Sequence, residues 1–199
     1  ATLAGRVAVD TETNSLDAMS AKLVGVSLSV EPGSACYIPL GHKLGNESDQ
    51  DSFDKVSQEE NSSAQIPLQE ALALLKPLLE DPHVLKIGQN LKYDMVVLAR
   101  SPYPIHMYPI DDTMIMSFVL DAGRGSHGMD ALSQLHLDIT PIAYKTVVGA
   151  GKHQVTFDQV SLDTACEYAA EDADITLRLA DFLRPRLVSE QMTTVYQTI

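Results

Sequence analysis

Residues 5–40 read GRVAVDTETNSLDAMSAKLVGVSLSVEPGSACYIPL, and they contain three segments that are typical of β-strands. The apolar run at 5–10 suits a buried strand, and residues 22–30 alternate as a strand does. Glu-Pro-Gly at 31–33 is a turn signal, so residues 35–40 are expected to return as the second arm of a hairpin. The sequence therefore predicts three adjacent strands in one sheet.

The rest of the chain predicts helices and one further strand, which makes the class α/β. A short buried strand is expected at 84–87. Helices are expected from Pro67 onward, over 90–100, from 113 onward, over 129 to about 136, and from Ser161 to about Arg184. Residues 137–157 are expected to be a loop because prolines and glycines interrupt them.

Caps and prolines indicate where several of these helices begin and end. Asp111 or Asp112 is a natural cap for the helix that follows them, and Ser161 is one for the last helix. Pro77 predicts a kink or an early stop in the first helix, and Pro185 predicts the end of the last one.

Length and composition set broad limits. With 199 residues, 45% of them apolar, the chain is long enough for one domain with a full core. No apolar run approaches the roughly 18 residues that a membrane helix requires, so we expect a cytoplasmic protein without a membrane partner. Cys36 and Cys166 form no metal-binding pattern and are expected to be buried, reduced thiols.

The formal net charge of −13 opposes a role with nucleic acid, because phosphate binding normally requires a basic surface. Residues 41–66 contribute −4 of this charge, and their polar, aperiodic sequence predicts a long, mobile surface insertion. A further four negative charges belong to the acidic motifs, where bound cations would offset them. The charge therefore argues against tight unaided DNA binding without excluding a nuclease.

Three acidic motifs stand out, each with a spacing that directs its side chains to one side: D-T-E at 10–12, N-L-K-Y-D at 90–94 and Y-A-A-E-D at 168–172. Residues two apart on a strand share a face, and residues four apart on a helix do so too. Each motif alone fits an ordinary exposed element, but together they predict one site for two divalent ions. Because the ligands are hard oxygens, the expected ions are Mg²⁺ or Mn²⁺.

Through these motifs the chain resembles the 3′-5′ proofreading exonuclease domain of bacterial family A DNA polymerases, in the DnaQ-like superfamily. The resemblance covers VAVDTETNSLDAMSAKLVGVSLSVEPGSACYIPL, LLKPLLEDPHVLKIGQNLKYDM and YAAEDADITLRL, and therefore most of the chain. It implies a ribonuclease H-like α/β fold with a mixed central sheet flanked by helices. One branch of the superfamily has histidine where this chain has Glu167, whereas Tyr168 matches the tyrosine branch.

The resemblance also implies a role for each acid. Asp10, Glu12, Asp94 and Asp172 would bind the two metal ions, with Asp10 bridging them. Tyr168 would hold the attacking water. Since a tyrosine with a pKa of about 10 is a poor base at neutral pH, Tyr168 should orient the water.

Contacts to the substrate are expected on other residues. Asn90 and Gln89 would contact the terminal nucleotide or its phosphate. Leu16 would either press between the last two bases or be a plain core leucine, and Tyr144 would stack on a base. Thr11 is included among the candidate substrate-binding residues, although strand alternation directs its side chain to the opposite face.

Other charged residues near the motifs are weaker candidates. Lys145, Lys152 and His153 would add local positive charge or simply lie in a solvated loop. Asp112 is interpreted as a helix cap and Asp174 as a neighbour of Asp172 on a different helical face, so neither is expected to bind metal.

The resemblance implies a monomeric bacterial exonuclease that acts in replication and repair, in the cytoplasm at the nucleoid. Its partners would be a single-stranded or frayed 3′ end of DNA and a polymerase domain of the same chain. Residues 1–185 would form the exonuclease domain, and 186–199 would begin the connection to the polymerase domain. Two alternatives are a stand-alone tyrosine-branch exonuclease that trims RNA, and a non-catalytic docking domain, which the presence of all four acids disfavours.

Overall fold

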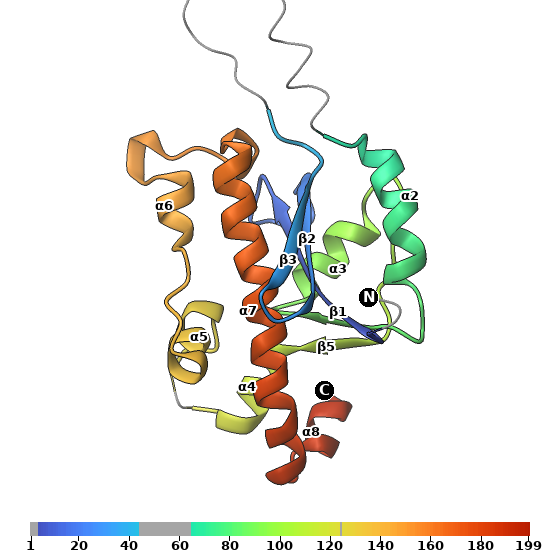
Figure 1. Ribbon diagram of the computed structural model, residues 1–199, viewed down its shortest axis with the longest axis vertical. Coiled ribbons are helices and arrows are strands. Elements are labelled where there is room, and N and C mark those ends of the chain that lie inside the picture. Colours follow the sequence, from blue (N-terminus) through green and yellow to red (C-terminus); the bar gives the residue numbers. More distant parts are fainter. Residues whose placement is uncertain (1–3, 44–64, 124) are drawn as a thin grey trace, which may run out of the picture.

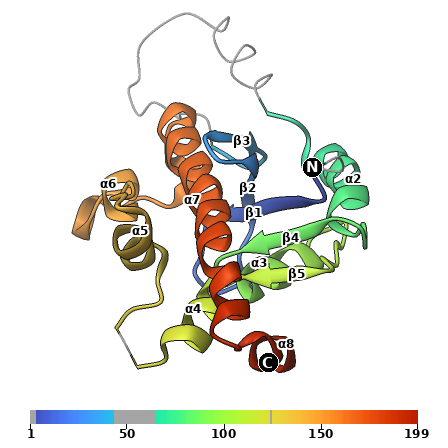
Figure 2. The same ribbon diagram turned by 60° about the horizontal axis from the view of Figure 1, so that its bottom comes forward.

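The computed structural model describes residues 4–43, 65–123 and 125–199, which form a β-sheet with helices on both faces (Figures 1 and 2). The predicted insertion at 41–66 lies almost entirely outside the described residues. Within them, no helix is both long enough and apolar enough to span a membrane.

The sheet has the strand order β3-β2-β1-β4-β5 in the described part of the chain. The strands are β1 (Arg6–Thr13), β2 (Leu23–Glu31), β3 (Ser34–Pro39), β4 (Leu85–Gly88) and β5 (Ile110–Asp112). β1, β2 and β3 pair antiparallel, which confirms the predicted hairpin, whereas β4 and β5 continue the sheet in parallel. Strand β5 is not predicted from the sequence, because a strand of three residues, two of them acidic, shows no alternation of apolar and polar residues.

The helices largely follow the predicted order: α2 (Leu68–Leu79), α3 (Lys92–Ala99), α4 (Thr113–Asp121), α5 (Met129–Leu137), α6 (Tyr144–Val148), α7 (Leu162–Ser189) and α8 (Thr193–Thr198). The expectation of a loop over 137–157 is wrong in part, since α6 and two 3₁₀ turns lie in or next to it, at Gly151–His153 and Phe157–Gln159. Val148 explains the difference, because this short helix buries it against Phe157. Five residues offer too little periodicity to be seen in the sequence.

The predicted end of the last helix at Pro185 and the early stop offered as one alternative for Pro77 are wrong, because both prolines lie inside helices. Pro77 is inside α2 and Pro185 is inside α7. In α7, continuing past the proline buries Leu187, which is 3% exposed, in the same apolar cluster as Leu183. Burial of a leucine contributes about 1.5–3 kcal/mol, so packing of the last turn offsets much of the roughly 3 kcal/mol that an interior proline costs.

Strand β1 divides the core into two layers. Val7 and Val9 point to one face, where they pack in the cluster formed with α2 and α3. Ala8 points to the other face, against Leu177 of α7. Figure 2 shows the long α7 lying along this second face of the sheet. Side chains of β1 can therefore reach both helical layers, according to whether their position is odd or even.

The last helix packs on the domain at the end of the sheet that carries β5. Met192 and Tyr196 lie against the apolar cluster of α4, α5 and α7. The Tyr196 hydroxyl donates to Asp111 Oδ1 over 3.1 Å and accepts the backbone N–H of Asp112 over 2.9 Å. α8 is therefore fixed to β5 by hydrogen bonds as well as by apolar contact.

The two cysteines differ from expectation. Cys36 and Cys166 are free thiols, as predicted, but both are exposed. Cys36 lies on β3 at the edge of the described sheet, and Cys166 lies near the start of α7, the helix that packs on β3.

Candidate active site

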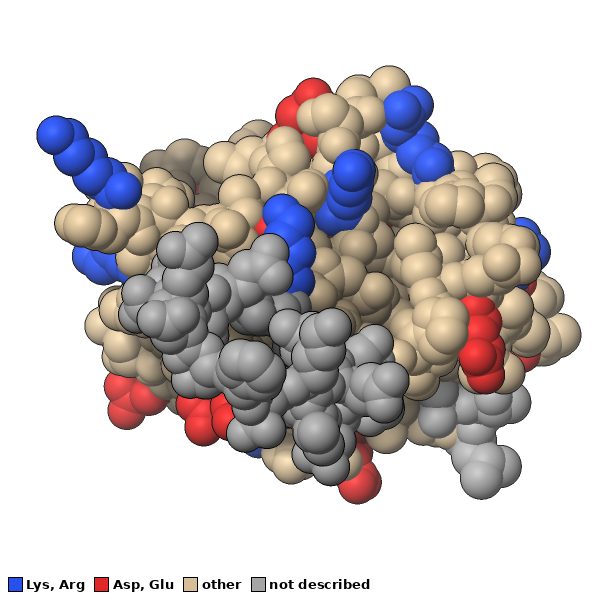
Figure 3. All heavy atoms as spheres, turned by 90° about the horizontal axis from the view of Figure 1, so that it is seen from above, with Lys and Arg blue, Asp and Glu red and all other residues tan. Residues whose placement is uncertain are grey.

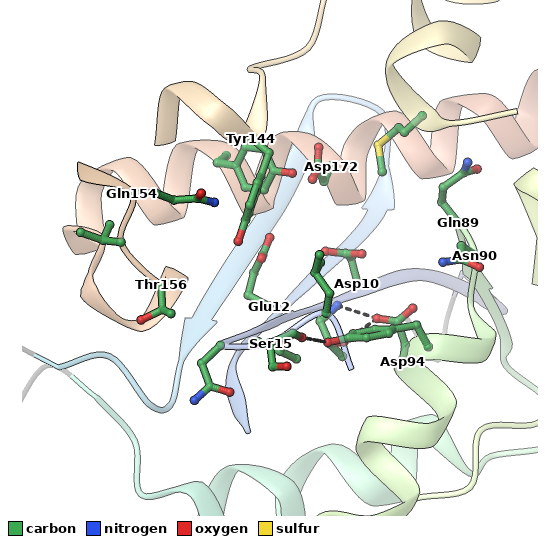
Figure 4. A pocket seen from close by; sticks show the side chains of 18 residues that line it. Asp10, Glu12, Ser15, Gln89, Asn90, Asp94, Tyr144, Gln154, Thr156 and Asp172 are labelled. Atoms are coloured by element: carbon green, nitrogen blue, oxygen red, sulfur yellow. Dashed lines mark hydrogen bonds between the residues drawn. The ribbon is translucent and has the colours of Figure 1, made fainter. Parts of the chain in front are cut away.

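A pocket with a cavity volume of about 540 Å³ collects the predicted residues from elements far apart in the chain. Its walls are β1 with the loop that follows it, the turn before α3, α3 itself, α6, residues 154–156 and α7. Figure 4 shows Asp10, Glu12 and Asp172 facing one another across this space. Every residue that the sequence analysis proposes for catalysis or substrate binding lines the pocket.

Asp10, Glu12 and Asp172 form the closest group, which we call the three-carboxylate group. One carboxylate oxygen from each lies within 4.8 Å of the others. Asp10 and Glu12 share the face of β1 that looks toward α7, as strand alternation predicts, and Asp172 projects from α7 to meet them. Glu12 and Asp172 are buried, and Asp10 is partly exposed.

Asp94 reaches the pocket from the other layer. It lies in the first turn of α3 and is 3% exposed. Its Oδ1 accepts the backbone N–H of Thr11 over 3.0 Å and also the Thr11 hydroxyl. Thr11 points away from its two acidic neighbours, as predicted, and its contact in the structure is with this fourth acid. The side chain of Thr11 therefore supports Asp94.

All four carboxyl groups hold their protons more tightly than ordinary acids. The pKa of Asp10 is raised to about 6 and the pKa of Asp172 to about 8. The pKa values of Glu12 and Asp94 are raised well above their usual range. Burial is the largest cause in each case, and the negative charge of Asp10 adds to it for the other three. Clustered, poorly hydrated carboxylates of this kind fit a divalent cation, whose charge would favour their ionised forms.

Tyr168 stands one helical turn before Asp172 on α7, so the predicted shared face is observed. The tyrosine hydroxyl is near enough to the Asp172 carboxyl group to lower the pKa of that group, against the larger effect of burial. Burial, followed by the charges of Asp172 and Glu12, raises the pKa of Tyr168 far above its usual range. The phenol therefore stays protonated at any physiological pH.

Asn90 does not lie on the helix that carries Asp94, which corrects the predicted stacking of the two on one helical face. α3 begins at Lys92, and Asn90 has a φ of 59°, in the left-handed region. Asparagine tolerates this conformation better than most residues, so the chain turns sharply here after Gly88. Asn90 still lines the pocket, but from a turn.

Gln89 lies beside Asn90 with both ends of its side-chain amide occupied. Its Nε2 donates to the His127 carbonyl over 2.8 Å, and its Oε1 accepts the Thr113 hydroxyl. These bonds fix the Gln89 side chain against α4 and the loop before α5. The structure thus gives Gln89 a supporting contact in addition to its place on the pocket wall.

Leu16 is not a core leucine, so this alternative for its role is excluded and the predicted contact with bases is the one that is left. Its side chain is 93% exposed and lies on the pocket rim in the loop after β1. Tyr93 of α3 holds this loop, because its hydroxyl donates to the Ser15 carbonyl and shares a hydrogen bond with Thr13. An exposed leucine on a fixed loop is available to contact a ligand.

Tyr144, the first residue of α6, lies on the wall near Tyr168. It is 40% exposed, and its ring is 5.9 Å from that of Tyr168 and 6.3 Å from that of Phe157, centroid to centroid. The Tyr144 and Phe157 planes are almost parallel, at 6°. Phe157, fully buried, thus supports the aromatic side chain that faces the pocket.

The basic candidates lie outside the pocket. Lys145, Lys152 and His153 are exposed and are not part of its lining. Figure 3 shows the molecule from above, where the visible Lys and Arg side chains lie scattered among uncharged ones. Of the two roles considered for these three residues, that of solvent-exposed surface residues fits their positions better than that of positive charge at the site.

The two acids left out of the metal set have structural contacts. Asp112 caps α4, with its carboxylate accepting the backbone N–H groups of Met114 and Ile115. Asp174 accepts the Gly33 N–H over 2.6 Å and pairs with Arg178 over 2.7 Å. The prediction that Asp112 caps a helix is confirmed, and Asp174 makes its contacts with Gly33 and Arg178.

The structure adds pocket residues that the sequence analysis does not name. The main ones are Tyr93, Gln154 and Thr156. Tyr93 directly precedes Asp94 in the second motif, so its place in the sequence could have indicated it. Gln154 and Thr156 lie in the segment expected to be a loop, where no periodic signal directs a side chain toward the site.

Comparison with known proteins gives sequence relatives over nearly the whole chain. A family model described as 3′-5′ exonuclease matches residues 2–188. DNA polymerase I of Rhizobium leguminosarum is 50% identical over 204 residues, which cover 98% of this chain and 19% of that protein. DNA polymerase I of Pseudomonas aeruginosa is 43% identical over 182 residues, which cover 91% of this chain and 18% of that protein. The chain thus spans less than a fifth of the length of either relative.

Solved structures share the fold at lower sequence identity. Brucella melitensis NrnC with bound Mg²⁺ has a TM-score of 0.68 at 23% identity, covering 98% of this chain and 79% of that one. Escherichia coli RNase D has a TM-score of 0.68 at 15% identity, covering 98% of this chain and 43% of that one. The mixed five-stranded sheet with flanking helices is the expected ribonuclease H-like fold.

Proposed function

Because the chain belongs to the 3′-5′ exonuclease domain family of DNA polymerase A, we propose that it hydrolyses nucleotides from the 3′ end of DNA with two divalent metal ions. The observation that carries this proposal is the three-carboxylate group, whose oxygens lie within 4.8 Å of one another in a pocket. The pocket also contains Asp94 and Tyr168.

Asp10, Glu12, Asp94 and Asp172 would hold the ions, which are Mg²⁺ or Mn²⁺ because every ligand is a carboxylate oxygen. When bound, divalent ions lower the pKa of water, neutralise charge on the phosphate and stabilise the departing 3′ oxygen. The fold of the chain brings the four acids together from both sides of β1, with Glu12, Asp94 and Asp172 buried. Thr11 contributes by fixing Asp94 through two hydrogen bonds.

Tyr168 would orient the attacking water, as in the tyrosine branch of the superfamily. Its raised pKa keeps the phenol protonated, so Tyr168 can position a water molecule but cannot act as a general base near neutral pH. Tyr144 and Phe157 restrict the Tyr168 ring on its other side, with centroid distances of 5.9 Å each.

The substrate strand would lie between the Leu16 loop, Tyr144 and Asn90. Leu16 would insert between the last two bases, and Tyr144 would stack on one of them. Base stacking contributes about 1–3 kcal/mol and tolerates any sequence, as removal of an arbitrary wrong nucleotide requires. The overall negative charge suits a site that accepts a single-stranded or frayed end presented by another domain.

We further propose that the chain is the proofreading part of a DNA polymerase I in the cytoplasm of a bacterium, acting in replication and repair. The support is that relatives of this name extend well beyond the matched region. A polymerase domain of the same protein would be its partner, and residues 1–185 would form the exonuclease domain.

A second candidate is trimming of RNA 3′ ends, because the fold resembles Escherichia coli RNase D, which is described as an exoribonuclease. Sequence favours DNA, since the identity of 50% to a DNA polymerase I exceeds the 15% to RNase D. A non-catalytic docking domain is the least supported candidate, since all four acids are present in the pocket.

The test uses 5′-labelled DNA and RNA strands of one sequence, incubated with the protein in Mg²⁺ or in EDTA. We expect the DNA to shorten from its 3′ end in Mg²⁺ only, faster than the RNA. Asp172→Ala should abolish cleavage, whereas Asp174→Asn, two residues along α7, should retain it. Faster loss of RNA would favour the trimming candidate, and binding without cleavage of either strand would favour the docking one.

A further inference from the structure

Asp112 holds two separate segments with one carboxylate. Oδ1 accepts the backbone N–H of Met114 over 2.9 Å and of Ile115 over 3.3 Å, which caps α4. The same carboxylate accepts the N–H of Asn90 over 3.1 Å at Oδ1 and of Leu91 over 2.7 Å at Oδ2. A helix cap needs only the first pair of bonds, so the second pair calls for another explanation.

The second pair of bonds fixes the turn between β4 and α3. Asn90 has a φ of 59°, and a residue other than glycine stays in this region only when its surroundings hold it there. Asp112 lies directly across from this turn, since it pairs with Gly88 in the parallel β4–β5 register. Its side chain is 6% exposed, so the carboxylate makes these bonds away from bulk solvent, where charge-assisted hydrogen bonds are strong.

The turn presents Asn90 to the pocket, beside the acids (Figure 4). The neighbouring Gln89 is held separately, by Thr113 and by His127. The backbone at Asn90 and Leu91, in contrast, is held by Asp112. Loss of this carboxylate would release Asn90, one of the two residues of the turn whose side chains are proposed to contact the terminal nucleotide.

We infer that Asp112 is a positioning residue for exonuclease activity, which it supports by fixing Asn90 in its left-handed conformation. This inference rests on the proposed function. Asp112 touches neither the three-carboxylate group nor Asp94 among the contacts of the structure, so its effect on catalysis runs through the turn.

The test compares two substitutions at this position. Asp112→Ser keeps an oxygen that caps α4, because serine is as good a cap as aspartate, but it has no second oxygen for the Leu91 N–H of the turn. Asp112→Ala removes both functions. Asp112→Ser is expected to keep a melting temperature close to that of the parent protein and to lose about 10- to 100-fold in kcat/KM on single-stranded DNA, mainly through a higher KM. Tyr196→Phe serves as the matched control, since it removes the hydroxyl next to Asp112 but leaves all four carboxylate bonds.

A double-mutant cycle with Asn90→Gly separates positioning from general disturbance. Glycine adopts the left-handed conformation freely and lacks the amide, so the turn persists without its contact group. In this background Asp112→Ser should change kcat/KM by less than about threefold, because the residue through which it acts is gone. An equal loss in both backgrounds, or a loss confined to kcat, would overturn the inference.

Hydrogen exchange gives a readout that does not depend on activity, and its measurement on the parent protein requires no variant to fold. In the parent protein the Asn90 and Leu91 amides should be protected, and in Asp112→Ser the Leu91 amide should exchange faster. Unprotected amides in the parent protein would refute the inference directly. A parent protein that fails to degrade DNA in Mg²⁺ would refute the proposed function, whereas an active parent and an equally active Asp112→Ser variant would refute only the role of Asp112.

Discussion

Replacing Asp172 by asparagine should stabilise the metal-free protein at neutral pH while abolishing its nuclease activity. Asp172 is 6% exposed and lies within 4.8 Å of two other carboxylates. Its pKa rises from an ordinary value of 3.8 to about 8, because of burial first and the charge of Asp10 second. Asparagine has no charge to bury and keeps a side-chain oxygen that can accept a hydrogen bond.

The direction and the magnitude of this change in stability follow from the different proton affinity of Asp172 in the folded and unfolded chain. Below about pH 4 the carboxyl group is neutral in both the folded and the unfolded chain, so the charge has no effect. As pH rises from about 4 to about 8, the unfolded chain releases this proton and the folded chain retains it, so the parent protein loses stability. Each pKa unit corresponds to about 1.4 kcal/mol, which gives an upper limit of about 4 kcal/mol at pH 7. Because Asp10 and Glu12 still repel each other after the substitution, we expect the free energy of unfolding at pH 7 to rise by about 2–4 kcal/mol.

The measurement is urea unfolding in EDTA at pH 7 and at pH 4.5. Asp172→Asn should be more stable than the parent protein at pH 7, with most of the difference gone at pH 4.5, and Mg²⁺ should stabilise the parent protein more than the variant. Asp174→Asn is the matched control, and it should be destabilised because that carboxylate binds Arg178 and the Gly33 N–H. If Asp172→Asn were no more stable than the parent protein at pH 7 in EDTA, the electrostatic account of the pocket would be refuted.

Three further predictions concern single residues. Asp94→Ala should reduce 3′-end cleavage by roughly 10²-fold or more with an unchanged circular dichroism spectrum, and a rate near that of the parent protein would contradict its role as a ligand. Tyr168→Phe should cost on the order of 10²-fold in kcat, while the pH–rate profile of the parent protein shows no inflection from the phenol up to pH 10, since its pKa is raised. Leu16→Ala should raise KM for a frayed 3′ end without changing the melting temperature, because the side chain is 93% exposed, and a lower melting temperature would indicate a packing role instead.

Much of the sheet and of the site can be predicted from the sequence because both depend on short-range periodicity. The alternation in β2 and the turn at Gly33 predict the hairpin, and the spacing of two residues places Asp10 and Glu12 on one face. The spacing of four places Tyr168 with Asp172 in the same way. In each case the geometry is local to one element.

The features that cannot be predicted depend on contacts between distant segments. The turn at Asn90 starts α3 two residues later than expected, and its conformation depends on Asp112. Pro185 does not end α7, because the helix gains apolar contacts at Leu187. The stacking of Phe157 on Tyr144 likewise requires that α6 and the 3₁₀ turn at Phe157–Gln159 pack against each other. Tertiary packing, which leaves no periodic signal in a single sequence, decides all three.

The link between Thr11 and Asp94 has a consequence for a newly made chain. Acids on β1, on α3 and on α7, which lies near the C-terminal end of the sequence, must come together, so neither layer of the molecule alone contains the full set. A nascent chain that has not yet emerged as far as residue 172 cannot complete the pocket, even if its first strands have already folded. If the proposed function holds, the ability to cleave DNA would arise only once both layers have closed on β1.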